Sequence, residues 1–268
     1  MPDFTLVEGT APLLVSLPHD GTGLPAAIAA RVSDAGKRVP DTDWHVGRLY
    51  AFARELGASV ITPRWSRYVA DLNRDPGGQA LYPGRSETTL VPVTTFGGEP
   101  IYRPGNEPDT DEIAARRAAY WQPYHDALAN ELTRMRRSHP LVVLWDGHSI
   151  RSRVPMFFDG ALPDFNLGTA GGTSCTQSLQ ERLTELLRMR AGAAGYSHVV
   201  NGRFKGGYIT RHYGRPETGV EAVQLELAQH IYMDEDSFDY LPERAVSVQD
   251  IMRVLLEACL GHARENAP

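Results

Sequence analysis

Two apolar runs that each lead into a histidine constrain this fold more than any other feature of the sequence. Residues 141–149 read LVVLWDGHS, an apolar run bounded by turn residues, which predicts a buried strand that ends shortly before His148. Residues 12–21 read PLLVSLPHDG and repeat this design around His19. Ligands of open α/β sheets bind just beyond the carboxyl ends of the strands, so the two histidines are predicted to share one site.

The composition is that of a globular protein and argues against several functional classes. Hydrophobic residues make up 42% of the 268 residues and charged residues 22%, which separates this chain from disordered ones. The net charge of −6 argues against a general nucleic-acid binder. No run approaches the roughly 20 apolar residues of a membrane span, and no secretory leader is visible. We expect a soluble, cytoplasmic protein in which Cys175 and Cys259 are packing residues.

Strand and helix patterns alternate along the chain. Strands are expected at 13–17, 59–62, 141–145, 154–158, 198–200 and 222–227. Helices are expected through 49–56, 113–135, 179–187 and 254–259. Pro123 is expected to kink the second of these helices or to mark its start. The alternation favours an α/β fold, a three-layer α/β/α sandwich with a mixed, mostly parallel sheet, in a single domain over residues 1–268.

Residues 71–108 interrupt this alternation. They hold many glycines and prolines and show little periodicity. A structureless segment of this length inside a compact domain is usually functional or disordered. Its arginines and aromatic residues favour a long ordered loop that covers a site. Residues 201–214 (NGRFKGGYITRHYG) have the same character.

Histidine and carboxylate side chains at the strand ends suggest a metal site. Zinc binds imidazole and carboxylate ligands, and catalytic zinc sites keep one position open for water. His19 and His148, together with Asp43 from the expected start of a helix, would form such a set. His45 is an alternative ligand on the same turn, and Asp43 or Asp41 is alternatively only a helix N-cap. Each histidine by itself is also consistent with a hydrogen-bonded structural residue.

Glu226 lies within the apolar segment VQLEL at 223–227. Alternation places Gln224 and Glu226 on the same face of a strand. A carboxylate among apolar strand residues is costly to bury without a partner or a task. We interpret Glu226 as a general base that acts on water at the metal site. A glutamate at a strand edge in a salt bridge is the alternative.

Arginines concentrate in the loop-like segments. Arginine forms bidentate hydrogen bonds with carboxylates, so these side chains are candidates for a pocket that binds an anionic substrate. The candidates are Arg74, Arg85, Arg103, Arg151, Arg153 and Arg211. Because most arginines are solvated, we expect only two or three of them to touch substrate.

Several segments, taken together and in order, resemble the N-formylglutamate amidohydrolase (N-formylglutamate deformylase) family. The similarity covers nearly the whole chain. The segments that carry it are 16–21 (SLPHDG), 41–46 (DTDWHV), 71–74 (DLNR), 146–152 (DGHSIRS), 201–214 (NGRFKGGYITRHYG), 224–227 (QLEL) and 232–235 (YMDE). Gly47 departs from the family pattern, which has an acidic residue there, and we expect it to face a helix surface.

The resemblance implies a fold like that of the zinc carboxypeptidases, with a mixed eight-stranded sheet between helix layers. It implies hydrolysis of N-formyl-L-glutamate to formate and L-glutamate, the last step of one bacterial route of histidine breakdown. His19 and His148 would then be metal ligands and Glu226 the catalytic glutamate. Thr22 stands where the His-x-x-Glu pair of the carboxypeptidases has its glutamate, and Asp43 is inferred as the third ligand.

The resemblance also implies the cofactor and the class of substrate. Zinc is the expected metal, although such ligand sets also accept cobalt, manganese or iron. The expected partner is a small acidic N-acyl amino acid, with no nucleic acid and no membrane. Substrate contacts are expected from Asn73, Arg74, Arg85, Arg151 and Arg211. The alternatives are an amidohydrolase for another N-acyl acidic amino acid and a non-catalytic protein that binds an acidic amino acid on the same fold.

Overall fold

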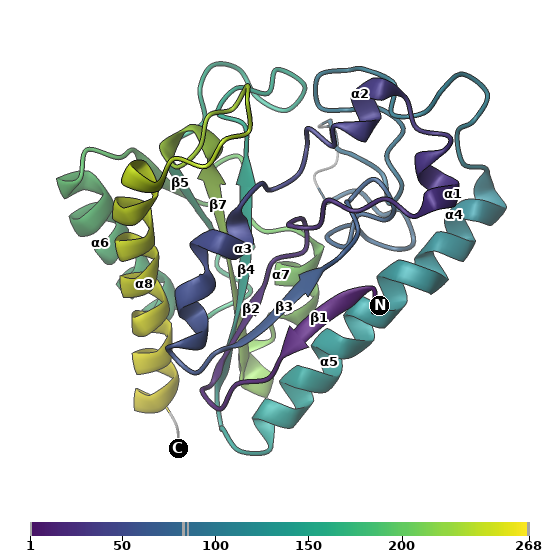
Figure 1. The fold of residues 1–268 in the computed structure, drawn as a ribbon. Coiled ribbons are helices and arrows are strands. Elements are labelled where there is room, and N and C mark those ends of the chain that lie inside the picture. The colour runs from purple at the N-terminus through teal and green to yellow at the C-terminus, as the bar shows by residue number, and fades with distance from the viewer. Residues whose placement is uncertain (1, 82–83, 85, 267–268) are drawn as a thin grey trace.

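A mixed sheet runs through the protein with helices on both faces (Figure 1). The computed structural model describes residues 2–81, 84 and 86–266. In these residues the strands are β1 (Phe4–Val7), β2 (Leu13–Ser16), β3 (Ser59–Pro63), β4 (Val142–Ile150), β5 (Phe165–Gly168), β6 (His198–Val200) and β7 (Val220–Ala228). Their order across the sheet is β1-β3-β2-β4-β7-β5-β6.

Most neighbouring strands are parallel. The pairs β2–β3, β2–β4, β4–β7 and β5–β6 run parallel, whereas β1–β3 and β5–β7 are antiparallel. The predicted mixed, mostly parallel sheet is confirmed. The described residues form seven strands, one fewer than the resemblance implied.

Two apolar cores hold the helices against the sheet. The helices are α1 (Ala26–Ala29), α2 (Asp34–Lys37), α3 (Val46–Leu49), α4 (Thr110–Arg116), α5 (Gln122–Arg136), α6 (Gln177–Ala193), α7 (Tyr208–Tyr213) and α8 (Pro242–Glu265). One core packs Val143 and Trp145 of β4 with α3, α6 and α8. The other packs Val142 and Leu144 with α5 and α7. Because successive strand residues point to opposite faces, β4 serves both cores, and the predicted three-layer arrangement is confirmed.

One expected strand is absent, and two short strands were not expected. Residues 154–158 form turns, so the prediction of a strand there is wrong. Val154 and Phe157 instead pack with Phe96 and Ile150 in a small apolar cluster under the loops. This cluster explains the error, because a buried loop and a buried strand have similar apolar composition. β1 and β5 are four residues each and carry little periodic signal.

The predicted helix over 113–135 exists, with an interruption. It begins at Thr110, where the side chain of Asp109 accepts a hydrogen bond from the Glu112 N–H. A π-helical turn, Arg117–Trp121, separates α4 from α5, and Pro123 lies in the first turn of α5. Proline lacks the backbone N–H that a continuous helix would use, so the irregular turn just before it follows from the sequence.

The turn before α3 differs from the expectation. Neither Asp41 nor Asp43 caps a helix; the N-cap of α3 is His45, which has a φ of 63° and no side-chain capping bond. Helix α3 is followed by a 3₁₀ turn, Ala51–Arg54, instead of a continuous helix. Gly47 does not face an open surface: its N–H donates to Asp20 Oδ1 at 2.9 Å, and a Cβ there would lie 2.5 Å from Asp20 Oδ2.

Two further expectations concern the cysteines and the membrane. Cys175 and Cys259 are free and buried in the core under α6 and α8, as packing residues. None of the helices in residues 2–81, 84 and 86–266 combines the length and the apolar character that a membrane span requires.

Candidate metal centre and active site

The register of β4 and β7 gathers four polar side chains at the carboxyl ends of the strands. Asp146 pairs with Gln224, and His148 pairs with Glu226. Residues two apart share a face, and directly paired residues of neighbouring strands also share one. All four are buried. Leu144, two residues before Asp146 on the same face of β4, packs in the apolar core with α5 and α7. The four polar side chains therefore lie on the α5 and α7 side of the sheet.

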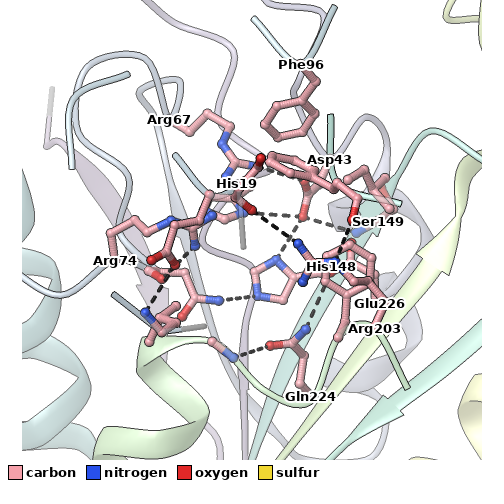
Figure 2. Close-up of a pocket in the computed structure, with 18 residues that line it drawn as sticks. His19, Asp43, Arg67, Arg74, Phe96, His148, Ser149, Arg203, Gln224 and Glu226 are labelled. Atoms are coloured by element: carbon pink, nitrogen blue, oxygen red, sulfur yellow. Dashed lines mark hydrogen bonds and ion pairs between the residues drawn. The ribbon is translucent and has the colours of Figure 1, made fainter. Parts of the chain in front are cut away.

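His19, the second histidine of the site, lies just after the end of β2. His19 follows that strand by three residues, and its carbonyl accepts a hydrogen bond from the Asp43 N–H at 3.0 Å. The ring centroids of His19 and His148 are 4.9 Å apart. His19, Asp43 and His148 form a buried cluster in which one ligand atom of each lies within 4.8 Å of the others. Figure 2 shows these three side chains facing one another at the centre of the pocket.

Both imidazoles turn their Nδ1 atoms toward the same carboxylate oxygen. His148 Nδ1 lies 3.0 Å from Asp43 Oδ2, and His19 Nδ1 lies 3.7 Å from it. The backbone N–H of Ser149 also donates to Asp43 Oδ2, at 3.1 Å. Asp43 therefore lies between the two rings, on the side where their Nδ1 atoms converge.

The outer nitrogen of His19 is held by a buried aspartate. His19 Nε2 lies 2.7 Å from Asp71 Oδ1, which also accepts from the Asn73 N–H at 3.0 Å. Arg67 donates to Asp71 Oδ2 at 2.6 Å. Burial acts to raise the pKa of Asp71, but Arg67 and His19 outweigh it and hold that pKa well below its ordinary value. Asp71 is thus an anion that fixes the orientation of the His19 ring.

The outer nitrogen of His148 has two neighbours. Nε2 lies 2.8 Å from Asn73 Nδ2 and 3.1 Å from Asp146 Oδ1. Asp146 Oδ2 accepts from Asn73 Nδ2 at 3.2 Å and from Thr210 Oγ1 at 3.1 Å. Burial acts to lower the pKa of His148, but Asp146 and Asp43 raise it well above its ordinary value. For Asp43, burial is outweighed by His19 and His148, which lower its pKa.

Glu226 has a different electrostatic environment from these aspartates. Its side chain is 7% exposed and lines the pocket. Burial raises its pKa to about 8, with further increases from Asp43 and Asp146 and opposing effects from His148 and Arg67. Gln224 Nε2 lies 3.4 Å from Glu226 Oε2, and Gln224 Oε1 accepts from the Gly207 N–H at 2.6 Å. A carboxyl group with this pKa exchanges a proton readily near neutral pH.

The cluster has the features of a site for a divalent cation. Two imidazole nitrogens and one carboxylate oxygen converge, and this donor set suits zinc. Asp71 and Asp146 lie at the opposite ring nitrogens, the position in which metal-bound histidines usually have a carboxylate. Asp146 Oδ1 is buried and has no hydrogen-bond partner among the described residues.

The pocket around the cluster contains arginines and aromatic side chains. Arg67, Arg74 and Arg203 line it together with Phe96 and Phe157. Arg67 is buried, pairs with Asp71 and lies over the Phe96 ring at 4.9 Å. In Figure 2, Arg67 and Arg74 lie on one side of the histidines and Arg203 on the other, near Glu226. The pocket thus combines an acid–base group, a candidate metal cluster and cationic side chains that suit an anionic ligand.

The structure brings together most of the residues expected from the sequence. His19, Asp43, Asn73, Arg74, His148 and Glu226 all line the pocket. The side chain of Arg151 pairs with Asp236 at 2.8 Å, and Arg211 lines a neighbouring depression with Asp75; neither is among the described residues of this pocket. Arg85 lies outside the described residues. His45 points elsewhere, with Nε2 2.8 Å from the Phe238 carbonyl.

Sequence reasoning gave no role to several charged residues that lie close to the histidines. Asp71 and Asp146 contact the outer histidine nitrogens, and Arg67 and Arg203 line the pocket. A signal for Asp146 exists in the sequence, because it is two residues before His148 on the same face of a strand. Asp71 and Arg203 lie in segments 71–74 and 201–214, which carry the family resemblance, whereas no such signal marks Arg67; all three reach the site through loops.

Comparisons with known proteins find relatives along nearly the whole chain. A family model described as N-formylglutamate amidohydrolase matches residues 11–233. The chain is 50% identical to the N-formylglutamate deformylase of Pseudomonas aeruginosa and 48% identical to that of Pseudomonas putida, each over 259 residues and 96% of both chains. A crystal structure of N-formylglutamate amidohydrolase from Ralstonia eutropha JMP134 has the same fold, with a TM-score of 0.82 and 24% identity over the full length of both chains. By the family match and these relatives, the chain belongs to the N-formylglutamate amidohydrolase family.

Proposed function

We propose that this protein hydrolyses N-formyl-L-glutamate to formate and L-glutamate with the help of a divalent metal ion. The observation that carries the proposal is one pocket in which the buried His19–Asp43–His148 cluster lies beside Glu226. The two relatives named N-formylglutamate deformylase, about half identical over 96% of the chain, support this choice of substrate. An acidic amino acid also suits the arginines of the pocket.

The metal would be held by His19 Nδ1, His148 Nδ1 and the Asp43 carboxylate. Zinc fits this donor set, and cobalt, manganese and iron are accepted by similar sets. When bound, such a cation supplies a Lewis acid that polarises an amide carbonyl and acidifies water. Asp71 and Asp146 would orient the two imidazoles through the opposite ring nitrogens.

Glu226 would move the proton in the reaction. It takes a proton from the water molecule that attacks the formyl carbon, and it passes this proton to the amide nitrogen as the carbon–nitrogen bond breaks. Its pKa of about 8, raised by burial, suits a group that must both accept and release a proton near neutral pH. Gln224, which contacts both Glu226 and the Gly207 N–H, would hold the carboxylate in place.

The arginines would bind the two carboxylates of the substrate. Arg74 lines the pocket while its Nε donates to Thr88 and its Nη1 to the Asn73 carbonyl. Arg203 lines the opposite side and donates to the Phe157 carbonyl at 2.8 Å. These bonds limit the motion of each guanidinium, which lowers the entropy lost on substrate binding. Arg85, Arg151 and Arg211 stay predictions from the sequence.

The segment 71–108 would act as the cover of this pocket within a single domain. Arg74, Leu81, Ser86, Glu87 and Phe96 all come from it and line the site. Among its described residues, Ser86 is joined to the opposite side of the pocket, because its carbonyl accepts a hydrogen bond from Arg203 at 3.2 Å. Such a cover would exclude bulk water and large acyl groups.

A substrate series tests the proposal. Purified protein loaded with zinc is assayed for formate release from N-formylglutamate, N-formylaspartate and N-formylalanine, and for glutamate release from N-acetylglutamate and N-succinylglutamate. We expect the highest kcat/KM with N-formylglutamate, and a value lowered by roughly 10²–10⁴-fold for Glu226→Gln. A preference for another acyl or amino acid would assign a different amidohydrolase activity. Binding of glutamate without any hydrolysis would instead favour the non-catalytic binding protein.

A further inference from the structure

Two side chains at the start of α5 hold the backbone on either side of Asn73. His125 Nε2 lies 2.8 Å from the Leu72 carbonyl, and Trp121 Nε1 donates to the Arg74 carbonyl at 3.1 Å. A carbonyl oxygen only accepts hydrogen bonds, so His125 is the donor in its pair. The chain is therefore attached to this helix through the residue before Asn73 and through the residue after it.

Trp121 and His125 form a rigid, buried pair. Their residues are four positions apart, so the rings lie on one face of the helix, with centroids 3.7 Å apart and planes inclined by 20°. Trp121 is 4% exposed and His125 3%. Tyr213 of α7 stacks with His125 at 5.9 Å, and its hydroxyl lies 3.0 Å from His125 Nδ1. Burial lowers the pKa of His125 to about 3, so its ring is neutral near pH 7.

The backbone that this pair holds carries two side chains of the pocket. Residues 72–74 belong to neither a helix nor a strand, so no ladder of backbone hydrogen bonds fixes them. Asn73 and Arg74 project from this stretch and line the pocket. Arg74 Nε donates to the Thr88 carbonyl at 3.0 Å, and its Nη1 donates to the Asn73 carbonyl at 3.1 Å. A shift of residues 72–74 would therefore carry the guanidinium with it.

We propose that Trp121 and His125 are positioning residues for substrate binding. They hold the backbone of residues 72–74 so that the Arg74 guanidinium lies where a substrate carboxylate binds. Neither is among the described residues that line the pocket, so they act through Arg74 and not by contact with substrate. This inference rests on the proposed function, since it takes Arg74 as a substrate contact.

Steady-state kinetics with N-formylglutamate at saturating zinc test the proposal. Trp121→Phe keeps an aromatic ring and removes the N–H, so the KM should rise by roughly 3–10-fold, the contribution of one hydrogen bond. The kcat should change less than about threefold, because the group that moves binds substrate and takes no part in proton transfer. His125→Leu should behave in the same way. His125→Gln should stay near the wild type, because its amide N–H can replace the Nε2 donor.

A double-mutant cycle separates positioning from general stability. In an Arg74→Ala background, Trp121→Phe should raise the KM by less than about twofold, because the side chain through which Trp121 acts is absent. The same fold-change in both backgrounds would show that Trp121 acts independently of Arg74 and would overturn the proposal.

Tyr124 supplies a matched control on the same helix. It is 1% exposed, and its hydroxyl lies 3.0 Å from Ser16 Oγ on β2. Tyr124→Phe thus also loses one buried hydrogen bond, but away from residues 72–74. It should lower the Tm as Trp121→Phe does and leave the KM unchanged. An equal rise of the KM in this control would show that any weakening of α5 impairs substrate binding, which contradicts a specific role of the pair.

Two outcomes distinguish this proposal from the proposed function. Formate release by the wild type together with an unchanged KM in Trp121→Phe would overturn the positioning role alone; this variant carries the test if His125→Leu fails to fold. Calorimetric titration with L-glutamate covers the other case. Weaker glutamate binding in Trp121→Phe, with no formate release from the wild type, would support the positioning role and overturn the proposed hydrolysis.

Discussion

His148 on β4 and Glu226 on β7 are directly paired across the two central parallel strands. Their side chains leave the same face of the sheet at neighbouring positions, so the candidate metal ligand and the candidate base are positioned by backbone hydrogen bonds. No loop has to move to bring them together. The sheet itself thus sets the distance between His148 and Glu226, the proposed metal ligand and the proposed base.

Replacement of Glu226 by glutamine should lower turnover without weakening the binding of zinc or substrate. The amide keeps the size of the side chain but cannot take a proton, so kcat should fall by roughly 10²–10⁴-fold, the usual contribution of a general base. Zinc content and the KM should stay close to those of the wild type. Formate assays together with metal analysis check this. Turnover within tenfold of the wild type would remove Glu226 from the reaction.

Replacement of His148 by alanine should abolish stoichiometric zinc binding. The variant removes one of the two nitrogen ligands of the cluster and leaves Asp43 without its 3.0 Å partner. His45→Ala is the matched comparison, because His45 is close in sequence to Asp43 but bonds to the Phe238 carbonyl. Metal analysis after gel filtration should find zinc in His45→Ala and none in His148→Ala. Zinc in His148→Ala but not in His45→Ala would identify His45 as the ligand.

Replacement of Arg74 by alanine should weaken substrate binding more than the chemical step. A hydrogen bond to a charged group contributes about 1.5–3 kcal/mol, which corresponds to a rise of the KM by roughly 10–100-fold. Arg188→Ala is the control, since Arg188 pairs with Glu185 on the exposed side of α6. Steady-state kinetics with N-formylglutamate measures both parameters. An unchanged KM for Arg74→Ala would place this arginine outside the substrate site.

The stability of the zinc-free protein should depend on pH through Glu226. Burial raises the pKa of Glu226 from 4.5 to about 8, so the native state keeps a proton that the unfolded chain has lost between these values. The stabilisation of the native state by this retained proton is complete below about pH 4.5 and is lost as the pH rises through 8. Glu226→Gln removes the dependence, so its Tm relative to the wild type should increase from pH 5 to pH 8.5. A constant or falling Tm difference in thermal scans of chelator-treated protein would contradict the shift.

Gly147 should be indispensable for packing on the face of β4 opposite the site. A Cβ at this position would lie 2.7 Å from Leu17 Cδ2 and 2.8 Å from Tyr50 Cε2. Overpacking of this kind costs about 1–3 kcal/mol, so Gly147→Ala should lower the free energy of unfolding by that amount. A Cβ added at Gly192 in α6 would lie in open space, so Gly192→Ala should be neutral or stabilising. Denaturant titrations of both variants give the comparison, and equal stabilities would contradict the clash.

Local patterns in the sequence were sufficient for the central elements and for part of the site. The apolar runs that became β2, β4 and β7 were predicted because strand burial leaves a continuous signal in composition. The same runs drew attention to His19, which follows β2, and to His148, although β4 continues to Ile150 and does not end before His148 as expected. The apolar run at 154–158 led to a wrong prediction of a strand, because residues buried in the cluster around Phe96 must be apolar but need not form a strand.

What the sequence determined by itself is the alternation of strands and helices, the family resemblance, and His19, His148 and Glu226 as candidates at strand ends. Only the tertiary structure decided that Asp43 rather than His45 faces both imidazoles. It also decided that Asp71 stands behind the His19 ring and that Arg67 and Arg203 reach the pocket. The physical reason is that strand burial is encoded in neighbouring residues. Contacts such as His19–Asp71 and Asp43–His148, between residues 52 and 105 positions apart, depend instead on strand register and loop paths, which no local pattern records.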